Sequence, residues 1–199
     1  MKKLSILSLF VILTSFTEGL KPGDQAINFN LKNVDGKMIS LDGIQNNKGV
    51  ILVFTCNHCP FSKAYEDRIM KLDQKYASAG YPVVAINPND PTIEPEDSFE
   101  NMQKLAKEKH FTFPYLFDET QATAKAYGAL RTPHVFVLKK GTEKGYTIEY
   151  IGAIDDNSDS PSEVKSKYVE NAVDALLNGK EVAVRETKAI GCGIKWKMN

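Results

Sequence analysis

The chain has 199 residues, of which 42% are hydrophobic and 25% charged, a composition typical of one globular domain with a substantial core. Its 25 basic and 25 acidic residues give a formal net charge of zero. This balance argues against a nucleic acid or an anionic surface as the partner.

The N-terminus has the pattern of a secretory signal peptide. Lys2 and Lys3 precede an apolar stretch that runs to Phe16 and is too short to be a typical membrane span. We expect a signal peptide over residues 1–19, with cleavage after Gly19, and an exported protein that is periplasmic or otherwise extracytoplasmic. An uncleaved N-terminal anchor is the alternative. After removal of the signal no membrane association is expected.

Two short strands are predicted next. Residues 27–31 alternate apolar and polar side chains, as a half-buried strand does, and a second apolar stretch covers residues 38–41. Asp35-Gly36 between them is a hairpin turn signal. The sequence therefore predicts an N-terminal β-hairpin extension ahead of the main fold.

A βαβ unit follows the hairpin. Val50–Phe54 is a continuous apolar run, typical of a strand buried on both faces. Apolar residues then recur at helical spacing over residues 61–76, and Val83–Ile86 is a second buried strand. This order predicts a right-handed crossover between parallel strands. The residues after Phe54 then lie at the carboxyl end of the first strand, where open α/β sheets place their chemistry.

The remaining elements complete a mixed sheet flanked by helices. Ser160 and Glu163 form a predicted capping box, with Pro161 at the first position of a helix that ends at Gly179. We expect one domain over residues 20–179 and a C-terminal tail packed on it. The other predicted elements are a helix over 99–106, a strand over 113–117, a helix over 122–127 and a hairpin of strands 135–138 and 148–151; the tail is 180–199.

The chemistry of the chain is predicted at Cys56-Asn57-His58-Cys59, which comes directly after the first buried strand. Two cysteines at this spacing can form and reopen a small disulfide ring. At a helix N-terminus the first sulfur is favoured as a thiolate, the form that attacks disulfides. We therefore expect Cys56 to be an accessible, acidified nucleophile and Cys59 to resolve the mixed disulfide. His58 would tune the thiolate by a hydrogen bond or a positive charge.

The chain resembles the thioredoxin-like superfamily. Residues 22–154 are similar to its redoxin branch, which includes the alkyl hydroperoxide reductase/thiol-specific antioxidant superfamily. The phrases CNHCPF, PEDSFENM, DETQATAKAYGA and GCGIKW resemble a subgroup described as peroxiredoxin-like thioredoxin-family proteins. The resemblance implies an α/β thioredoxin-like fold and an antioxidant or disulfide-exchange activity.

The resemblance also assigns roles to a loop far along the chain. Thr132-Pro133 precedes a strand at the place where thioredoxin-like proteins carry a cis peptide bond. By resemblance, this loop faces the cysteine motif, and the backbone of Thr132 pairs with a substrate peptide. The implied partners are protein thiols or disulfides and a redox partner, and no cofactor is expected.

A peroxiredoxin-like thiol peroxidase is one alternative function. Peroxiredoxins carry a threonine three residues before the peroxidatic cysteine and a proline seven before it. Neither Cys56 nor Cys59 has these neighbours, although Thr55 is adjacent and Arg131 could stand for the family's arginine. The peroxiredoxin mechanism therefore does not follow directly from the sequence.

A Cu(I)- or Zn-binding module is the other alternative. Cys56, Cys59 and His58 are soft or borderline ligands, and His134 follows the cis-proline candidate. The fourth ligand of a zinc site is missing from the motif. A permanently closed disulfide between the two cysteines of the motif is a further alternative. Cys192 is expected to be a half-buried thiol, because nothing in the sequence places it near Cys56.

Overall fold

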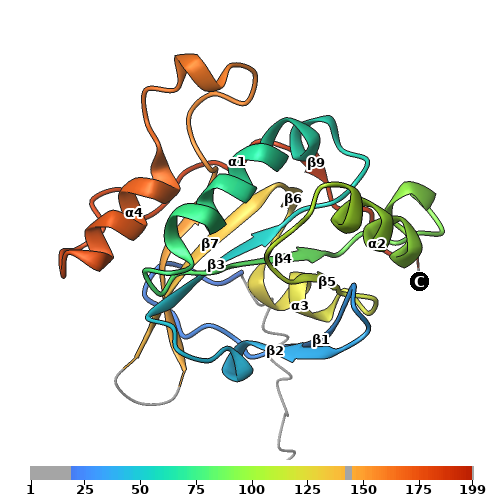
Figure 1. The fold of residues 1–199 in the computed structure, drawn as a ribbon, viewed down its shortest axis with the longest axis horizontal. Helices are drawn as coiled ribbons and strands as arrows, with labels where there is room; N and C mark the ends of the chain where they lie inside the picture. The colour runs from blue at the N-terminus through green and yellow to red at the C-terminus, as the bar shows by residue number, and fades with distance from the viewer. Residues whose placement is uncertain (1–18, 142–144, 199) are drawn as a thin grey trace, which may run out of the picture.

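The protein is described by a computed structural model over residues 19–141 and 145–198. In these ranges the chain forms a seven-stranded mixed sheet with helices on both faces (Figure 1). This confirms the predicted α/β architecture. No helix of the described part is long and apolar enough to cross a membrane. The predicted signal peptide lies outside the described residues, except for Gly19.

The sheet has the strand order β2-β1-β5-β4-β3-β7-β8. Strand β4 pairs in parallel with β3 and with β5, and the other pairs are antiparallel. The predicted N-terminal hairpin is confirmed as β1 and β2, and the later one as β7 and β8. The bounds are β1 Asn30–Asn33, β2 Met38–Ser40, β3 Gly49–Phe54, β4 Val83–Asn87, β5 Tyr115–Phe117, β7 His134–Lys140 and β8 Tyr146–Gly152.

Strand β3 lies inside the sheet between β4 and β7, and all six of its residues are buried. Side chains of a strand alternate between the two faces of its sheet. Accordingly, Ile51 and Val53 belong to one hydrophobic cluster, whereas Val50, Leu52 and Phe54 belong to the cluster on the opposite face. Both faces of the strand are covered, and its carboxyl end is fixed by two cores at once.

The helices divide between these two cores (Figure 1). Helices α1, α2 and α4 contribute to the cluster with Ile51, and the short α3 contributes to the other, together with the N-terminal hairpin. Helix α1 joins the parallel strands β3 and β4, which confirms the predicted βαβ unit. The bounds are α1 Pro60–Tyr76, α2 Phe99–Glu108, α3 Ala122–Tyr127 and α4 Tyr168–Leu177.

The predicted continuous helix over residues 160–179 is wrong at its start. Residues 161–163 form only a 3-10 turn, and α4 begins at Tyr168. Ser160 caps no helix, and its hydroxyl lies 3.1 Å from that of Ser162. The preceding segment is instead held by Arg68 of α1, which donates to both oxygens of the buried Asp155 carboxylate. This tertiary contact overrides the local capping signal.

The C-terminal tail runs back across the domain. Its strand β9 (Cys192–Gly193) pairs antiparallel with β6 (Arg131–Thr132) in a separate two-stranded sheet (Figure 1). Ile194 and Trp196 pack against the core that contains Leu52. The tail thus lies beside the loop that leads into β7.

Candidate active site

The cysteine motif occupies the loop between β3 and α1. Cys59 is the N-cap residue of α1, and Pro60 takes the first helical position, where its missing N–H costs nothing. Cys56 lies three residues before this cap. The first cysteine is therefore outside the first turn of the helix, which weakens the dipole effect expected from the sequence.

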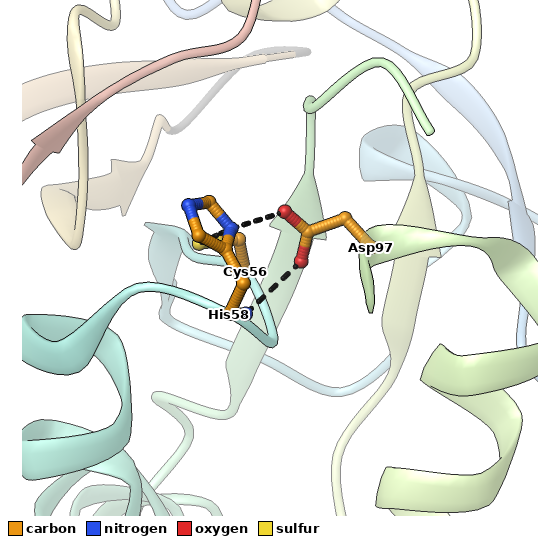
Figure 2. A group of neighbouring side chains, drawn as sticks. All are labelled: Cys56, His58 and Asp97. Carbon is orange, nitrogen blue, oxygen red and sulfur yellow. Dashed lines mark hydrogen bonds and ion pairs between the residues drawn. The ribbon is translucent and has the colours of Figure 1, made fainter. Parts of the chain in front are cut away.

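Cys56 is a free thiol in a nearly closed environment, with only 4% of the residue exposed. Its Sγ lies 3.1 Å from Thr132 Oγ1 and 3.6 Å from Ser62 Oγ. His58 Nδ1 is also 3.6 Å from this sulfur (Figure 2). Three groups that can donate a hydrogen bond to a thiolate thus surround one sulfur.

Burial nevertheless raises the pKa of the Cys56 thiol, and the negative charge of Asp97 raises it further. The hydroxyls of Thr132 and Ser62 and the backbone N–H of Cys59 act in the opposite direction, but with smaller effects. The prediction that the Cys56 thiol is accessible and acidified is therefore wrong for this state. A thiol exchanges only after it loses its proton, so this site needs a proton acceptor or an opening movement.

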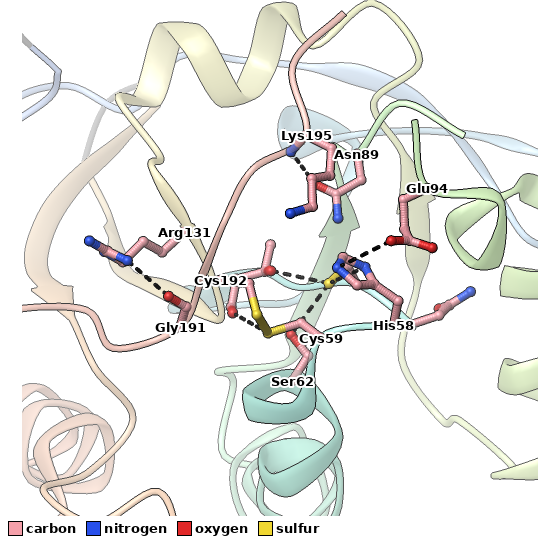
Figure 3. Close-up of a disulfide and its surroundings, with 12 residues drawn as sticks. His58, Cys59, Ser62, Asn89, Glu94, Arg131, Gly191, Cys192 and Lys195 are labelled. Atoms are coloured by element: carbon pink, nitrogen blue, oxygen red, sulfur yellow. Dashed lines mark hydrogen bonds and ion pairs between the residues drawn. A yellow bond between two sulfur atoms is a disulfide. The ribbon is translucent and has the colours of Figure 1, made fainter. Parts of the chain in front are cut away.

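His58 is oriented by two carboxylates. Its Nδ1 lies 2.6 Å from Asp97 Oδ2 (Figure 2), and its Nε2 lies 3.7 Å from Glu94 Oε2 (Figure 3). A carboxylate only accepts, so His58 Nδ1–H donates to Asp97. The same nitrogen lies 3.6 Å from Cys56 Sγ, but its one hydrogen is directed at Asp97. A doubly protonated ring would be a cation beside the thiolate.

Asp97 is the principal residue that the sequence analysis missed. It is fully buried, and besides His58 it accepts hydrogen bonds from Asn57 N at 2.6 Å and Asn89 Nδ2 at 2.7 Å. It comes from a 3-10 turn, Pro95–Asp97, in the insertion after β4. Asp97 lies in the phrase PEDSFENM, which resembles the family but does not indicate a contact with the cysteine motif.

The disulfide in the structure joins Cys59 to Cys192, across 133 positions of sequence (Figure 3). The predicted thiol at Cys192 is therefore wrong, and the motif is not closed on itself, since Cys56 is free. The pairing of β6 with β9 places Cys192 opposite Thr132. Thr132 O lies 3.3 Å from Cys59 Sγ, so the two bonded cysteines meet beside this residue.

The peptide bond between Thr132 and Pro133 is cis, which confirms the prediction. Both motif cysteines contact Thr132: Cys56 through the hydroxyl and Cys59 through the carbonyl. The loop therefore faces the motif. Arg131 points elsewhere and donates to the carbonyl of Gly191 in the tail at 2.9 Å.

The groups that could share a metal ion differ from the predicted set. Ligand atoms of Cys56, His58 and Asp97 lie within 4.8 Å of one another. Cys59 is bonded to Cys192 and offers no thiolate, and His134 is not part of the group. Any metal would also have to replace the proton between His58 and Asp97. Burial lowers the pKa of His134 to about 4, which keeps that ring neutral at physiological pH.

A small cavity lies next to Cys56 and is lined mostly by apolar side chains of α1, β4 and the segment that runs from α2 to β5. Its one carboxylate is Glu66, whose Oε2 lies 3.3 Å from Lys109 Nζ. Within the described chain Glu66 Oε1 has no hydrogen-bond partner. Glu66 thus lines the same cavity as Cys56, and the motif did not indicate it.

Replacing Thr132 by valine is expected to raise the pKa of Cys56, because the valine lacks the hydroxyl that lies 3.1 Å from Sγ. Alkylation of Cys56 followed against pH measures the change. The Thr132→Ser variant is the matched control, since it keeps a hydroxyl, and it should stay close to the wild type. An unchanged pH profile in Thr132→Val would show that the hydroxyl does not stabilise the thiolate.

The fold and the site together define a thioredoxin-like protein: a central mixed sheet, a CxxC loop before α1 and a cis-proline loop facing it. The exposed lipoprotein thioredoxin of Streptococcus pneumoniae shares the fold, with a TM-score of 0.52 and 20% identity over 67% of this chain and 93% of that one. Residues 22–147 match the AhpC/TSA family, and the chain belongs to this family. The predicted redoxin resemblance is confirmed.

Two other relatives are more similar in sequence. An uncharacterized conserved protein from Geobacillus kaustophilus is 39% identical, with a TM-score of 0.82 over 89% of this chain and 93% of that one. Thiol-disulfide oxidoreductase ResA from Halalkalibacterium halodurans is 27% identical over 123 residues, which are 62% of this chain and 65% of ResA. The match thus spans slightly less than two thirds of ResA.

Proposed function

We propose that this protein is an exported thiol–disulfide oxidoreductase that acts on protein thiols and disulfides. The observation that carries the proposal is the free Cys56 thiol, held between His58 and the cis-proline loop. The similarity to ResA supports the same activity. The buried carboxylate of Asp97 fixes His58, so the site has an attacking sulfur and a positioned imidazole beside it.

The proposed reaction uses Cys56 as the catalytic nucleophile. Its thiolate attacks a client disulfide and forms a mixed disulfide, while one client sulfur leaves as a thiolate. Cys59, when reduced, attacks the Cys56 sulfur and releases the second client thiol. His58, held by Asp97, lies beside the sulfur, and the loop of Thr132 and Pro133 receives the client backbone. Run in reverse, the same steps oxidise a client dithiol.

Export remains part of the proposal. Its support is the basic and apolar pattern of residues 1–19, which would be removed to leave a domain over 20–179 with the tail 180–199. Cysteine exchange chemistry also suits an oxidising compartment outside the cytoplasm. N-terminal sequencing of the protein recovered from its source cell tests the cleavage site directly.

The activity is tested with residues 20–199 and insulin as a disulfide-containing client. With dithiothreitol as electron donor, the protein is expected to accelerate insulin precipitation well above the rate with dithiothreitol alone. A parallel assay should show oxidation of a reduced peptide dithiol by the oxidised protein. If neither rate exceeds its background, the oxidoreductase proposal is refuted.

Peroxide reduction is a second candidate, favoured by membership of the AhpC/TSA family. A sulfenic acid at Cys56 would be its first product, formed with release of water from hydrogen peroxide. Trapping with dimedone followed by peptide mass spectrometry distinguishes it. Rapid labelling at Cys56 together with no insulin reduction would favour the peroxidase over disulfide exchange.

A further inference from the structure

The sulfur of Cys59 has two neighbours with which it can bond. It is joined to Cys192 in the disulfide. Its second neighbour is Cys56, because both motif cysteines contact Thr132 and the Cys59 backbone N–H interacts with Cys56. Cys56 is therefore a free thiol close to an existing disulfide. This is the arrangement of reactants for an internal thiol–disulfide exchange.

The tail is fixed around Cys192 by contacts that do not depend on the disulfide. On one side Arg131 donates to Gly191 O, and on the other Ile194 N donates to Leu130 O at 3.2 Å. Further along, the backbone of Lys195 binds Asn89: its N–H donates to Asn89 Oδ1 at 2.9 Å. These bonds hold the tail in place when the disulfide opens, so Cys192 stays near Cys59.

Gly191 lets the tail approach the cis-proline loop. A Cβ at this position would collide with the backbone carbonyl of Thr132 and lie 3.0 Å from Pro133 N. Only glycine permits this close approach without a shift of the loop. The backbone thus brings Cys192 against the same residue that both motif cysteines contact.

The three cysteines also differ in exposure. Cys59 is fully buried and Cys56 is 4% exposed, whereas Cys192 is half-buried. An external thiol attacks the sulfur that it can reach. Of the two sulfurs in the disulfide, that sulfur is Cys192.

We propose that Cys192 is a third redox-active cysteine and that the disulfide migrates from Cys56–Cys59 to Cys59–Cys192 during the catalytic cycle. The Cys192 thiolate attacks Cys59 Sγ, a Cys59–Cys192 bond forms, and Cys56 leaves as the thiolate. No external electrons are needed. A dithiol reductant then attacks Cys192 and reduces the pair. This inference rests on the proposed function, and it gives the tail the role of receiving electrons.

The first test maps disulfides in the oxidised protein by alkylation and peptide mass spectrometry. Oxidised wild type is expected to have one free thiol, at Cys56. The Cys192→Ser variant is expected to have none, because Cys56 and Cys59 then pair with each other. Two free thiols in Cys192→Ser would overturn the inference, as would a Cys56–Cys59 bond in fully oxidised wild type.

The second test follows migration in time. Fully reduced protein is mixed with hydroxyethyl disulfide, quenched with acid at intervals and mapped. A Cys56–Cys59 species is expected first, followed by Cys59–Cys192, and Cys56→Ser should form the latter bond much more slowly. Equal rates in wild type and Cys56→Ser would overturn the migration and leave Cys192 a structural brace.

Trp196 is the only tryptophan of the chain and lies in the tail, so its fluorescence controls for a detached tail. Its emission maximum should be the same in Cys192→Ser and wild type. If the emission maximum shifts in Cys192→Ser, disulfide mapping of Cys192→Ala and the quenched time course of the wild type test the role of Cys192 instead. Neither disulfide-mapping test involves a client. If both tests give the expected result but the protein does not reduce insulin, only the proposed function is refuted and the inference about Cys192 is not.

Discussion

The Cys56→Ser variant is expected to lose its acceleration of insulin reduction completely, down to the rate of dithiothreitol alone. The hydroxyl of serine neither attacks a disulfide nor forms a mixed disulfide. The two remaining cysteines, Cys59 and Cys192, can close on each other. The insulin assay with equal amounts of both proteins measures the loss. This is the largest effect that we expect from one side chain.

The loss in Cys56→Ser must be separated from unfolding. Because Cys59 and Cys192 can still bond to each other, the variant should keep its disulfide and the far-ultraviolet circular dichroism of the wild type. Substantial insulin reduction by a folded Cys56→Ser variant would mean that another sulfur, such as Cys192, is the attacking one.

The Asp97→Asn variant is expected to lower both the pKa of Cys56 and the stability of the fold. Burial is the larger cause of the raised pKa of Cys56 and is unchanged, but the second cause, the charge of Asp97, is removed. The amide also cannot accept on both sides: with its oxygen in the place of Oδ2, which faces His58 and Asn89, its NH2 group meets the Asn57 N–H that donates to Oδ1. Leaving buried donors unpaired costs about 1–3 kcal/mol each.

Alkylation against pH and urea unfolding measure the two effects of Asp97→Asn. Glu96→Gln is the matched control, because Glu96 is the adjacent carboxylate, but its side chain is 65% exposed and pairs with the exposed Lys63. An exposed pair of this kind contributes at most about 1 kcal/mol. A Cys56 pKa that stays the same or rises in Asp97→Asn would contradict the electrostatic account of the site.

The sequence predicted the parts of the fold that depend on local pattern. The apolar run Val50–Phe54 and the helical spacing after Pro60 indicated a βαβ unit, and both elements are present. The cis bond at Pro133 was expected from the family resemblance and is also present. These features are encoded within short stretches, so they could be recognised without knowing which distant residues meet.

The rest of the site depends on long-range contacts. Asp97 reaches His58 from an insertion 39 positions away, and Cys192 reaches Cys59 across 133 positions. The burial that raises the pKa of Cys56 likewise comes from packing that no local pattern describes. The motif therefore indicated the cysteine that we propose as the nucleophile, but its environment was predicted incorrectly.

The most direct test of the central claim, that Cys56 is the attacking sulfur, is to trap the mixed disulfide. Reduced Cys59→Ser protein cannot resolve through Cys59 and should accumulate a covalent complex with a disulfide-containing client. Peptide mass spectrometry is expected to find the client cysteine bonded to Cys56. A complex bonded only through Cys192, or no complex with a client that the wild type reduces, would contradict this account.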